Sequence, residues 1–482
     1  MQTQQRWTLV VVCAATAMLM LDIAVVNTAL SRIAEDLNTG LSGLQWVVDA
    51  YTLALASVVL TAGSLADRLG RRRLFTIGLG IFTVASAACA LAQDIVVLNT
   101  SRAVQGVGAA IMFAVSLALL ANAFPGAKER AGALAAYGAT IGGAFAIGPL
   151  VGGLLTSGLD WQWIFLVNIP IGIACLYVTR AYVAESRDPN AHGIDWGGQV
   201  TLTAGLFLLV LALLRGNEDG WTSPLIVAEL IGAAVALAAF VAVELRTAQP
   251  MLPLRYFRDG SFAGAQITAF AISASFFAVF LYITLYLQQI LGLSAIEAGL
   301  VYLPGTLVML LVSGATAQLG TKVPARTMIS GGLALVAIGL GLLMLAGTDS
   351  SWTIMLPGVL VACVGTGLFN PALTNVALSS VPAEQSGVAA GVNDTFRQAG
   401  IAVGVAALGA LIPAEAAFGA GTPGEYVSGM HDALLAGGIL AAVGALAGWF
   451  LISSRYGAAA EMPAEETEAE RHAALRPAYE AA

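Results

Sequence analysis

The sequence contains fourteen apolar runs that are each long enough to cross a lipid bilayer as an α-helix. A hydrocarbon core about 30 Å thick requires roughly 20 apolar residues at about 1.5 Å of rise per residue. In a chain that is 58% hydrophobic and only 10% charged, such runs exclude a water-soluble protein. We therefore predict an all-α membrane protein with 14 transmembrane helices, at 7–29, 43–66, 74–93, 96–122, 130–156, 163–183, 196–214, 223–244, 261–288, 296–318, 326–346, 353–378, 386–412 and 430–452.

Lysine and arginine are concentrated in alternate loops, which gives the expected orientation of the chain. With the N-terminus inside, 17 of the 21 cations lie in cytoplasmic segments, while Arg32 and Arg215 lie outside and Arg102 and Arg397 lie within spans. Cytoplasmic loops of membrane proteins carry such an excess of positive charge. The run that begins at Trp7 is too long for the apolar region of a cleavable signal. We therefore expect a multi-pass protein of a bacterial plasma membrane with both termini in the cytoplasm.

Charge and cysteine content exclude several other classes of protein. The net charge of −8 argues against a nucleic-acid-binding surface, where basic patches supply most of the affinity. The cysteines lie singly in separate apolar runs, which offers neither a disulfide framework nor a metal-binding spacing; they are Cys13, Cys89, Cys175 and Cys363. We expect a monomer embedded in the lipid bilayer that is not an enzyme and uses no cofactor or metal.

The runs divide into two sets of six with two between them. The predicted segments are an N-terminal six-helix bundle (1–185), an inserted helix pair with its linkers (186–258), a C-terminal six-helix bundle (259–455) and a disordered acidic cytoplasmic tail (456–482). A weak repeat supports the two halves, because GSLADRLGRRRLF at 63–75 is echoed by GATAQLGTKVPARTMI at 314–329. Paired bundles with a binding site at their interface are a common transporter plan, although a generic loop coincidence also explains this echo.

Charged residues interrupt the apolar runs at a few positions. A charge inside the bilayer costs several kcal/mol, so it normally faces a partner or a water-filled cavity. From the helix rise, Asp22 lies roughly 7 to 9 Å below the outer boundary, and Asp49 and Arg102 lie about 9 Å below it. At one depth on helices 1, 2 and 4, these three side chains can pair across a cavity and carry protons. The alternative is a static polar cluster that only fixes helix packing.

Three other ionisable residues fall inside predicted spans. Asp394 and Arg397 are spaced i,i+3 on the thirteenth span and can neutralise each other on one helix face. Asp394 is also a candidate for a second acidic site. Glu229 faces either the inserted pair or a lipid headgroup.

Small and aromatic residues mark two further spans. The fifth contains GATIGGAFAIGPLVGGLL at 138–155, whose small residues allow close helix contact and whose Pro149 interrupts the hydrogen-bond ladder. The ninth carries Phe276, Phe280 and Tyr282, which project near one another at helical spacing. Such rings can line an apolar, drug-sized pocket, although lipid-facing or core packing explains them equally well.

These motifs resemble those of the major facilitator superfamily, specifically its fourteen-helix drug:proton antiporter branch, over nearly the whole chain. GSLADRLGRRRLF is similar to the superfamily signature between helices 2 and 3, and LNTSRAVQGVGAA at 98–110 is similar to the helix 4 motif. GPLVGG in the fifth span resembles the antiporter motif, and LDIAVVNTALS at 21–31 resembles the motif on helix 1. DWQWIFLVNIPIG at 160–172 and NDTFRQAG at 393–400 also recur in that branch.

The buried charges and ring spacing described above, together with the resemblance, give each group of candidate residues an expected role. Proton coupling is expected at Asp22, Asp49, Arg102 and Asp394. Substrate binding is expected at Asp22, Asn27, Asp49, Tyr51, Phe276, Phe280, Tyr282, Asn393 and Asp394. The conformational gate is expected at Gly63, Asp67, Arg68, Gly70, Arg71, Arg72, Gly148 and Pro149. Within this gate, Asp67 can accept hydrogen bonds from a neighbouring helix N-terminus, whose partial positive charge favours a carboxylate.

The sequence departs from the family pattern at a few positions. Ala144 stands where the antiporter motif usually has glycine, and Ala24 and Ser31 stand where threonine and proline are common on helix 1. None of these changes removes a charge. Asp49 occupies a position that is acidic in only some relatives, which leaves the number of protons carried open.

We predict a proton-coupled antiporter that exports small hydrophobic drugs or antibiotics, cationic ones included, by alternating access. One alternative is an exporter of a specific self-made natural product. An importer or uniporter is disfavoured because the GP motif in the fifth span is typical of exporters. A channel lacks the repeated ring of polar residues that it requires, and a non-transporting receptor or sensor lacks a loop long enough for a signalling domain.

Overall fold

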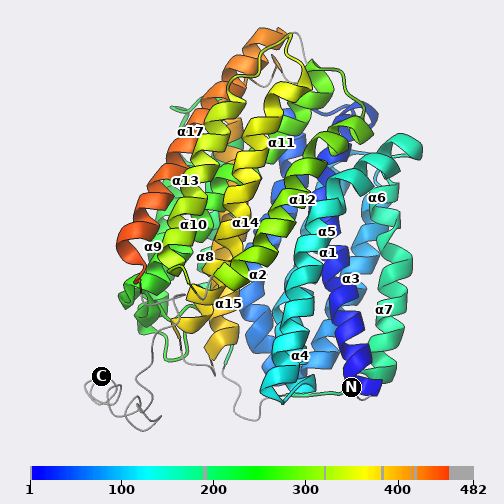
Figure 1. The fold of residues 1–482 in the computed structure, drawn as a ribbon, viewed down its shortest axis with the longest axis vertical. Coiled ribbons are helices and arrows are strands. Elements are labelled where there is room, and N and C mark those ends of the chain that lie inside the picture. The colour runs from blue at the N-terminus through cyan, green and yellow to red at the C-terminus, as the bar shows by residue number, and fades with distance from the viewer. Residues whose placement is uncertain are drawn as a thin grey trace.

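The computed structural model describes residues 3–187, 193–319, 322–381, 385–413, 415–416 and 421–454, and in these ranges the chain consists of helices and connecting loops without a strand. The predicted tail at 456–482 lies outside the described residues. Helix α1 begins and helix α17 ends at the same end of the bundle (Figure 1). We call that end the inner end and the opposite one the outer end, following the orientation that the sequence predicts.

The helices fall into two six-helix bundles and an inserted pair. The N-terminal half contains α1 (Thr3–Leu37), α2 (Leu41–Leu69), α3 (Arg71–Ala90), α4 (Ile95–Ala123), α5 (Ala127–Gly158), α6 (Trp163–Leu166) and α7 (Asn168–Tyr182). The inserted pair is α8 (Trp196–Asp219) and α9 (Pro224–Arg246). The C-terminal half contains α10 (Gly260–Ile272), α11 (Ala278–Leu285), α12 (Ala295–Leu319), α13 (Ala325–Leu343), α14 (Leu356–Ser379), α15 (Ser386–Gly409) and α17 (Pro423–Leu451).

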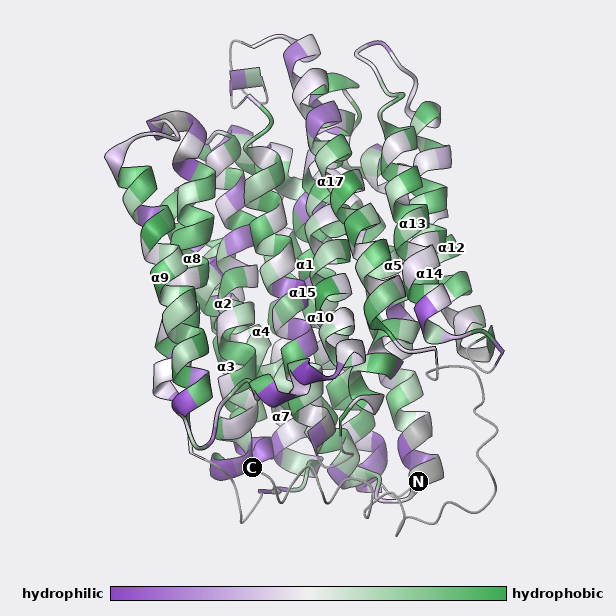
Figure 2. Ribbon diagram, turned by 90° about the vertical axis from the view of Figure 1, so that its left-hand side faces the viewer, coloured by the Kyte–Doolittle hydropathy of each residue, from purple (hydrophilic) through white to green (hydrophobic). Residues whose placement is uncertain are grey.

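Thirteen membrane-length helical segments in the described residues are also apolar enough to cross a bilayer. The one predicted span outside this set is the thirteenth, which corresponds to α15; this helix has 24 residues but carries Asp394, Arg397 and several amides. Its polar character is accommodated because it packs inside the protein, against α2 and α10. Figure 2 shows that hydrophobic residues cover most of the helix lengths, while hydrophilic residues gather near the helix ends.

Two predicted spans are less regular than their sequences indicate. The sixth is broken into α6 and α7 at Val167. The ninth contains two π-helical turns, Ser273–Phe277 and Tyr286–Ile290, on either side of α11. Since π-helical turns are rare and occur frequently at functional sites, the ninth span is a candidate functional segment.

The halves meet along two helix pairs. Helix α5 packs against α12, and α2 packs against α15, so each pair contains one helix from each half. Close approach of α5 and α12 depends on glycine, because a Cβ atom at Gly299 would collide with the carbonyl oxygen of Pro149. The inserted helix α8 packs on both α2 and α15, so it spans the line where the halves meet.

Candidate functional site

The centre of the N-terminal half contains a buried ion pair between α1 and α4. A guanidinium nitrogen of Arg102 lies 2.5 Å from a carboxylate oxygen of Asp22, and both side chains are almost inaccessible. The Nε atom of Arg102 also donates to the carbonyl oxygen of Val47 at 3.0 Å, and its guanidinium group lies 4.3 Å from the ring centre of Tyr51. Two of the three residues predicted to share a depth are therefore in direct contact.

Amide side chains complete the surroundings of the Asp22 carboxylate. Its second oxygen accepts hydrogen bonds from Gln105 at 2.8 Å and from Asn168 at 3.0 Å. The oxygen of the Gln105 amide accepts from Arg102 at 2.6 Å, and the hydroxyl group of Ser86 accepts from Gln105. We call these five residues, from α1, α3, α4 and α7, the Asp22 cluster. Every charge in it is paired, which is what makes burial of an ion pair tolerable.

Three members of the Asp22 cluster, Ser86, Gln105 and Asn168, are not among the predicted site residues. Gln105 lies in the helix 4 motif beside Arg102, while Ser86 and Asn168 each lie in an apolar span, where a single small polar residue is easily overlooked. The signal for Asn168 is its place in FLVNIPIG, where an amide interrupts an otherwise apolar run.

Glycine brings α2 and α4 together beside this cluster. A Cβ atom at Gly106 would collide with the carbonyl oxygen of Tyr51 and would lie 3.0 Å from the Cβ atom of Ala54. Because the first of these atoms belongs to the backbone, it cannot move without moving α2. The residue at 106 therefore controls how closely Arg102 can approach Tyr51 and Val47.

Replacing Gly106 by alanine is expected to lower the stability of the protein by about 1–3 kcal/mol, the usual cost of forcing an extra methyl group into a packed interior. The measurement is the thermal unfolding temperature of the purified protein. The matched control is Gly80→Ala on α3, where a Cβ atom meets nothing within 4 Å. Equal unfolding temperatures for the two variants would contradict the tight contact between α2 and α4.

Asp49 lies apart from the ion pair. It is completely buried on α2, and neither of its carboxylate oxygens has a hydrogen-bond partner among the described residues. The predicted pairing of Asp49 with Asp22 and Arg102 is therefore wrong, although the three residues are expected at one depth. Val47 and Tyr51 are the residues of α2 that face Arg102, and Asp49, two residues from each, points elsewhere. It remains a buried acid without a counter-charge in contact.

The candidate acidic site of the C-terminal half lies on α15. Asp394 is buried, and one of its carboxylate oxygens has no hydrogen-bond partner among the described residues. Arg397 is within electrostatic reach of it, one turn further along the helix. The neighbouring amide of Asn393 donates to Gln266 of α10 at 3.2 Å. The residues predicted on this span therefore form a polar group on α15, the helix that packs against α2.

The predicted substrate-binding residues occupy different surroundings. Phe280 stacks on Tyr302 with ring centres 4.1 Å apart, while Phe276 packs edge-on against Phe277. Asn27 donates back to its own helix, at the carbonyl oxygen of Ile23. The hydroxyl group of Tyr51 is buried without a partner in the described residues, and that of Tyr282 is bound to the C-terminal half and to α2.

The signature between α2 and α3 forms a compact arrangement at the inner end. Asp67 pairs with Arg71 at 2.8 Å, while Arg68 is exposed. Glu185, which follows α7, accepts from the backbone N–H groups of Arg72 and Arg73. In this structure the acid at the start of α3 is therefore Glu185 rather than the predicted Asp67, which is occupied by Arg71.

The glycines of the predicted gate differ in whether the structure has room for a side chain at their positions. Gly70 has a φ of +107°, and a Cβ atom there would lie 2.7 Å from Glu185, so the turn requires glycine. A Cβ atom at Gly148 would collide with Ala24, so this glycine brings α5 against α1. Pro149 lies inside α5 next to it. At Gly63 a Cβ atom meets nothing within 4 Å, so packing does not require glycine in this conformation.

Glu229 belongs to the inserted pair and not to the sites described above. It accepts from Arg215 of α8 at 3.1 Å, and Arg215 also pairs with Asp219 at 2.7 Å. Of the two surroundings expected for Glu229, the structure therefore shows the inserted pair. This ion pair joins α8 to α9 near the outer end.

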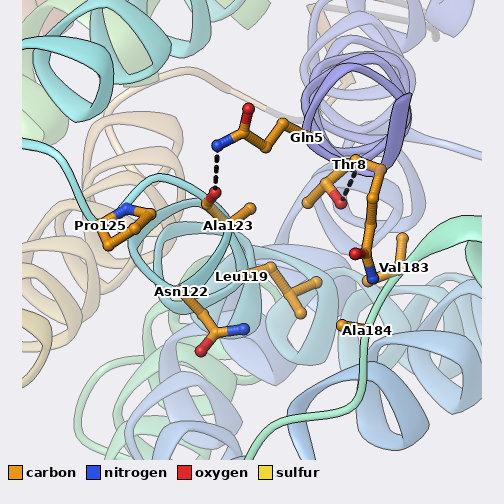
Figure 3. A pocket seen from close by; sticks show the side chains of 9 residues that line it. Gln5, Thr8, Leu119, Asn122, Ala123, Pro125, Val183 and Ala184 are labelled. Atoms are coloured by element: carbon orange, nitrogen blue, oxygen red, sulfur yellow. Dashed lines mark hydrogen bonds between the residues drawn. The ribbon is translucent and has the colours of Figure 1, made fainter. Parts of the chain in front are cut away.

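A cavity of about 260 Å³ lies at the inner end, away from the Asp22 cluster. Figure 3 shows that it is bordered by the start of α1, the end of α4 and the segment after α7, and that Gln5 donates to the carbonyl oxygen of Ala123 beside it. Its lining side chains are amides, a hydroxyl and apolar groups: Gln4, Gln5, Thr8, Leu119, Asn122, Ala123, Pro125, Val183 and Ala184. It contains none of the predicted site residues.

Comparisons with known proteins agree in placing the chain among membrane transporters. A family model described as Major Facilitator Superfamily matches residues 12–405. Multidrug resistance protein Stp of Mycobacterium tuberculosis is 37% identical over 414 residues, covering 86% of this chain and 77% of that protein. Methylenomycin A resistance protein of Streptomyces coelicolor is 33% identical over 436 residues, covering 90% and 89%. A crystal structure of peptide transporter POT in complex with sulfate has a TM-score of 0.63 at 16% identity, covering 92% and 96%, and supports the fold alone.

Proposed function

Because the chain belongs to the major facilitator superfamily, we propose that it exports small hydrophobic drugs or antibiotics across a bacterial plasma membrane in exchange for protons. Relatives that cover most of its length are named for multidrug resistance and for methylenomycin A resistance, which supports a drug as the substrate. In this proposal the inner end faces the cytoplasm, the protein acts as a monomer, and the proton gradient is the only energy source.

The observation that carries the proposal is the buried ion pair of Asp22 and Arg102 with its three amide and hydroxyl neighbours. Removing two charges from water costs several kcal/mol, and replacing such a pair by apolar residues often stabilises a protein. A membrane protein that retains the pair in the middle of a bundle therefore uses it for something besides stability.

Proton exchange at Asp22 would change how the helices of the N-terminal half are joined. When Asp22 is ionised, it pairs with Arg102 of α4 and accepts a hydrogen bond directly from the side-chain amide of Asn168 of α7. A proton on this carboxyl group removes its charge, so the attraction for Arg102 is lost and α1 is free to shift against α4. Because protonated and ionised forms favour different helix arrangements, proton binding can drive a conformational change.

Asp49 and Asp394 are the other two acids that we expect to bind a proton or the substrate. Both are buried acids with carboxylate oxygens that lack partners in the described residues. We propose that they hold a proton in one state and face a cationic or hydrogen-bonding group of the substrate in the other. The proposed neutral contacts are Tyr51 on α2, Asn393 on α15 and Phe280 on α11.

Dye efflux from reconstituted vesicles tests the proposal. With a proton gradient imposed, vesicles that contain the protein are expected to move a fluorescent cationic dye against its concentration gradient, and a protonophore is expected to stop this movement. Unchanged dye movement in the presence of the protonophore would reject proton antiport. Movement of dye and protons in the same direction would indicate an importer.

A resistance panel on a drug-sensitive host separates a broad exporter from one that handles a single natural product. Export of a single natural product is worth testing because one relative, which aligns over 90% of this chain, is named for resistance to a single antibiotic, methylenomycin A. Protection against chemically unrelated drugs would support multidrug export. Protection against one antibiotic class alone would support the narrower function.

A further inference from the structure

Three residues join the two halves by side-chain hydrogen bonds near the outer end. The amide of Gln45 on α2 donates to the hydroxyl group of Tyr282 on α11 at 2.9 Å. That hydroxyl group donates to the carbonyl oxygen of Val405 on α15, which lies 3.5 Å from the same amide. We call Gln45, Tyr282 and Val405 the outer clasp.

The clasp is buried and closely fitted. The side chains of Gln45 and Tyr282 are 4% and 0% exposed. They fit only because residue 409 is glycine, since a Cβ atom there would collide with the Gln45 amide and with the Tyr282 hydroxyl group. A buried polar group that loses its partner costs more than the hydrogen bond itself contributes, so the clasp opens only if water reaches it.

The outer clasp lies near the outer end of the bundle, where a gate between the outer surface and the buried acids is expected. Gln45 is the fifth residue of α2 from its outer end, and Val405 is four residues from the outer end of α15. Asp49 follows one helical turn inward of Gln45 and is within electrostatic reach of Tyr282. The clasp therefore separates this buried acid from the outer surface.

The helix that carries Tyr282 is short and lies between two irregular turns. Helix α11 has only eight residues and lies between the π-helical turns Ser273–Phe277 and Tyr286–Ile290. Converting such a turn to regular α-helix changes the rotation of the segment that follows it. A small rotation of α11 would withdraw the Tyr282 hydroxyl group from Gln45 without unfolding the span.

We propose that Gln45 and Tyr282 form the outer gate of the transport path, closed in this structure and opened when the halves separate at the outer end. The inference rests on the proposed function only in requiring that the halves separate. Other contacts between the halves near this end, such as Gln288 donating to the carbonyl oxygen of Thr28 at 2.9 Å, add to the closure. The clasp differs from them in being formed between two buried side chains.

Distances between spin labels on the two halves test the gate. Labels are attached at Gly40→Cys and Asp349→Cys, which are exposed at the outer ends of opposite halves, after the four native cysteines are replaced. The protein is measured in lipid nanodiscs without drug, by double electron–electron resonance. In Tyr282→Phe the ratio of the long-distance to the short-distance population is expected to rise about tenfold, because two hydrogen bonds are lost.

The matched control is Tyr286→Phe on the same span. The Tyr286 hydroxyl group donates to the carbonyl oxygen of Gly347 at 2.7 Å, so its loss also removes a hydrogen bond, but one inside the C-terminal half. The control is expected to leave the distances unchanged. A wild-type distance distribution in Tyr282→Phe, or an equal shift in both variants, would overturn the gate.

A second variant, Gly409→Ala, and a measurement of drug affinity distinguish the gate from other roles of Tyr282. Gly409→Ala places a methyl group against both clasp side chains and is expected to shift the distances in the same direction as Tyr282→Phe. If Tyr282 instead contacts the substrate, Tyr282→Phe would change drug affinity and leave the drug-free distances unaltered, which also overturns the gate. The distance measurement uses neither drug nor proton gradient. A negative result would therefore reject the gate while leaving drug export intact, and a failure of drug export would leave the gate intact.

Discussion

Replacing Asp22 by asparagine is expected to abolish proton-driven drug export. Asparagine has nearly the same shape and still offers an oxygen to Gln105 and Asn168, but it cannot bind and release a proton. We expect the initial rate of drug efflux to fall by about a hundredfold, the lower end of what a positioned proton carrier contributes in enzymes. The measurement is dye efflux from vesicles under an imposed proton gradient, with protein amount and orientation matched to the wild type.

The control for this experiment is Glu229→Gln. Glu229 is also buried and paired with an arginine, Arg215, but it belongs to the inserted pair. This variant is expected to keep most of the efflux rate. If Asp22→Asn exports dye as fast as Glu229→Gln does, the assignment of Asp22 to proton coupling is wrong.

The second large effect is expected at Arg102, and it concerns stability. In Arg102→Leu the Asp22 carboxylate loses its cation while it remains buried, and such a change typically costs about 3–5 kcal/mol. The hydrogen bond to Val47 and the contact with Tyr51 are lost with it. We therefore expect a large fall in the thermal unfolding temperature and in the amount of protein that inserts in the membrane.

Combining the two substitutions separates stability from transport. In the double variant Asp22→Asn with Arg102→Leu no charge is left unpaired at this place, so much of the lost stability is expected to return. Export is not expected to return, because no proton carrier has been restored. A double variant as unstable as Arg102→Leu alone would mean that the packing of Arg102, and not its charge, holds the four helices together.

The sequence predicts the depth of a residue in the membrane better than its direction. Helix rise is nearly constant, so counting residues placed Asp22 and Arg102 at one level, and the two side chains are in contact. The same count puts Asp49 with them, yet its carboxylate oxygens have no hydrogen-bond partner among the described residues. Rotation about a helix axis depends on the packing of neighbouring helices, which is not contained in the spacing along one span.

Contacts between distant parts of the chain were also beyond prediction. Glu185 reaches the start of α3 across 113 residues, and Gln45 meets Tyr282 across 237. Each of these residues is unremarkable in its own stretch of sequence, and only the folded bundle shows its partner. The π-helical turns beside α11 are likewise set by packing, because the ninth span reads as a continuous apolar helix.

The most direct test of the central claim is drug-induced proton release from the purified protein in a weakly buffered solution with a pH indicator dye. If Asp22 exchanges a proton during transport, adding a transported drug is expected to release protons from the wild type, and this signal should be lost in Asp22→Asn. Undiminished proton release from Asp22→Asn would show that the transported proton is carried elsewhere.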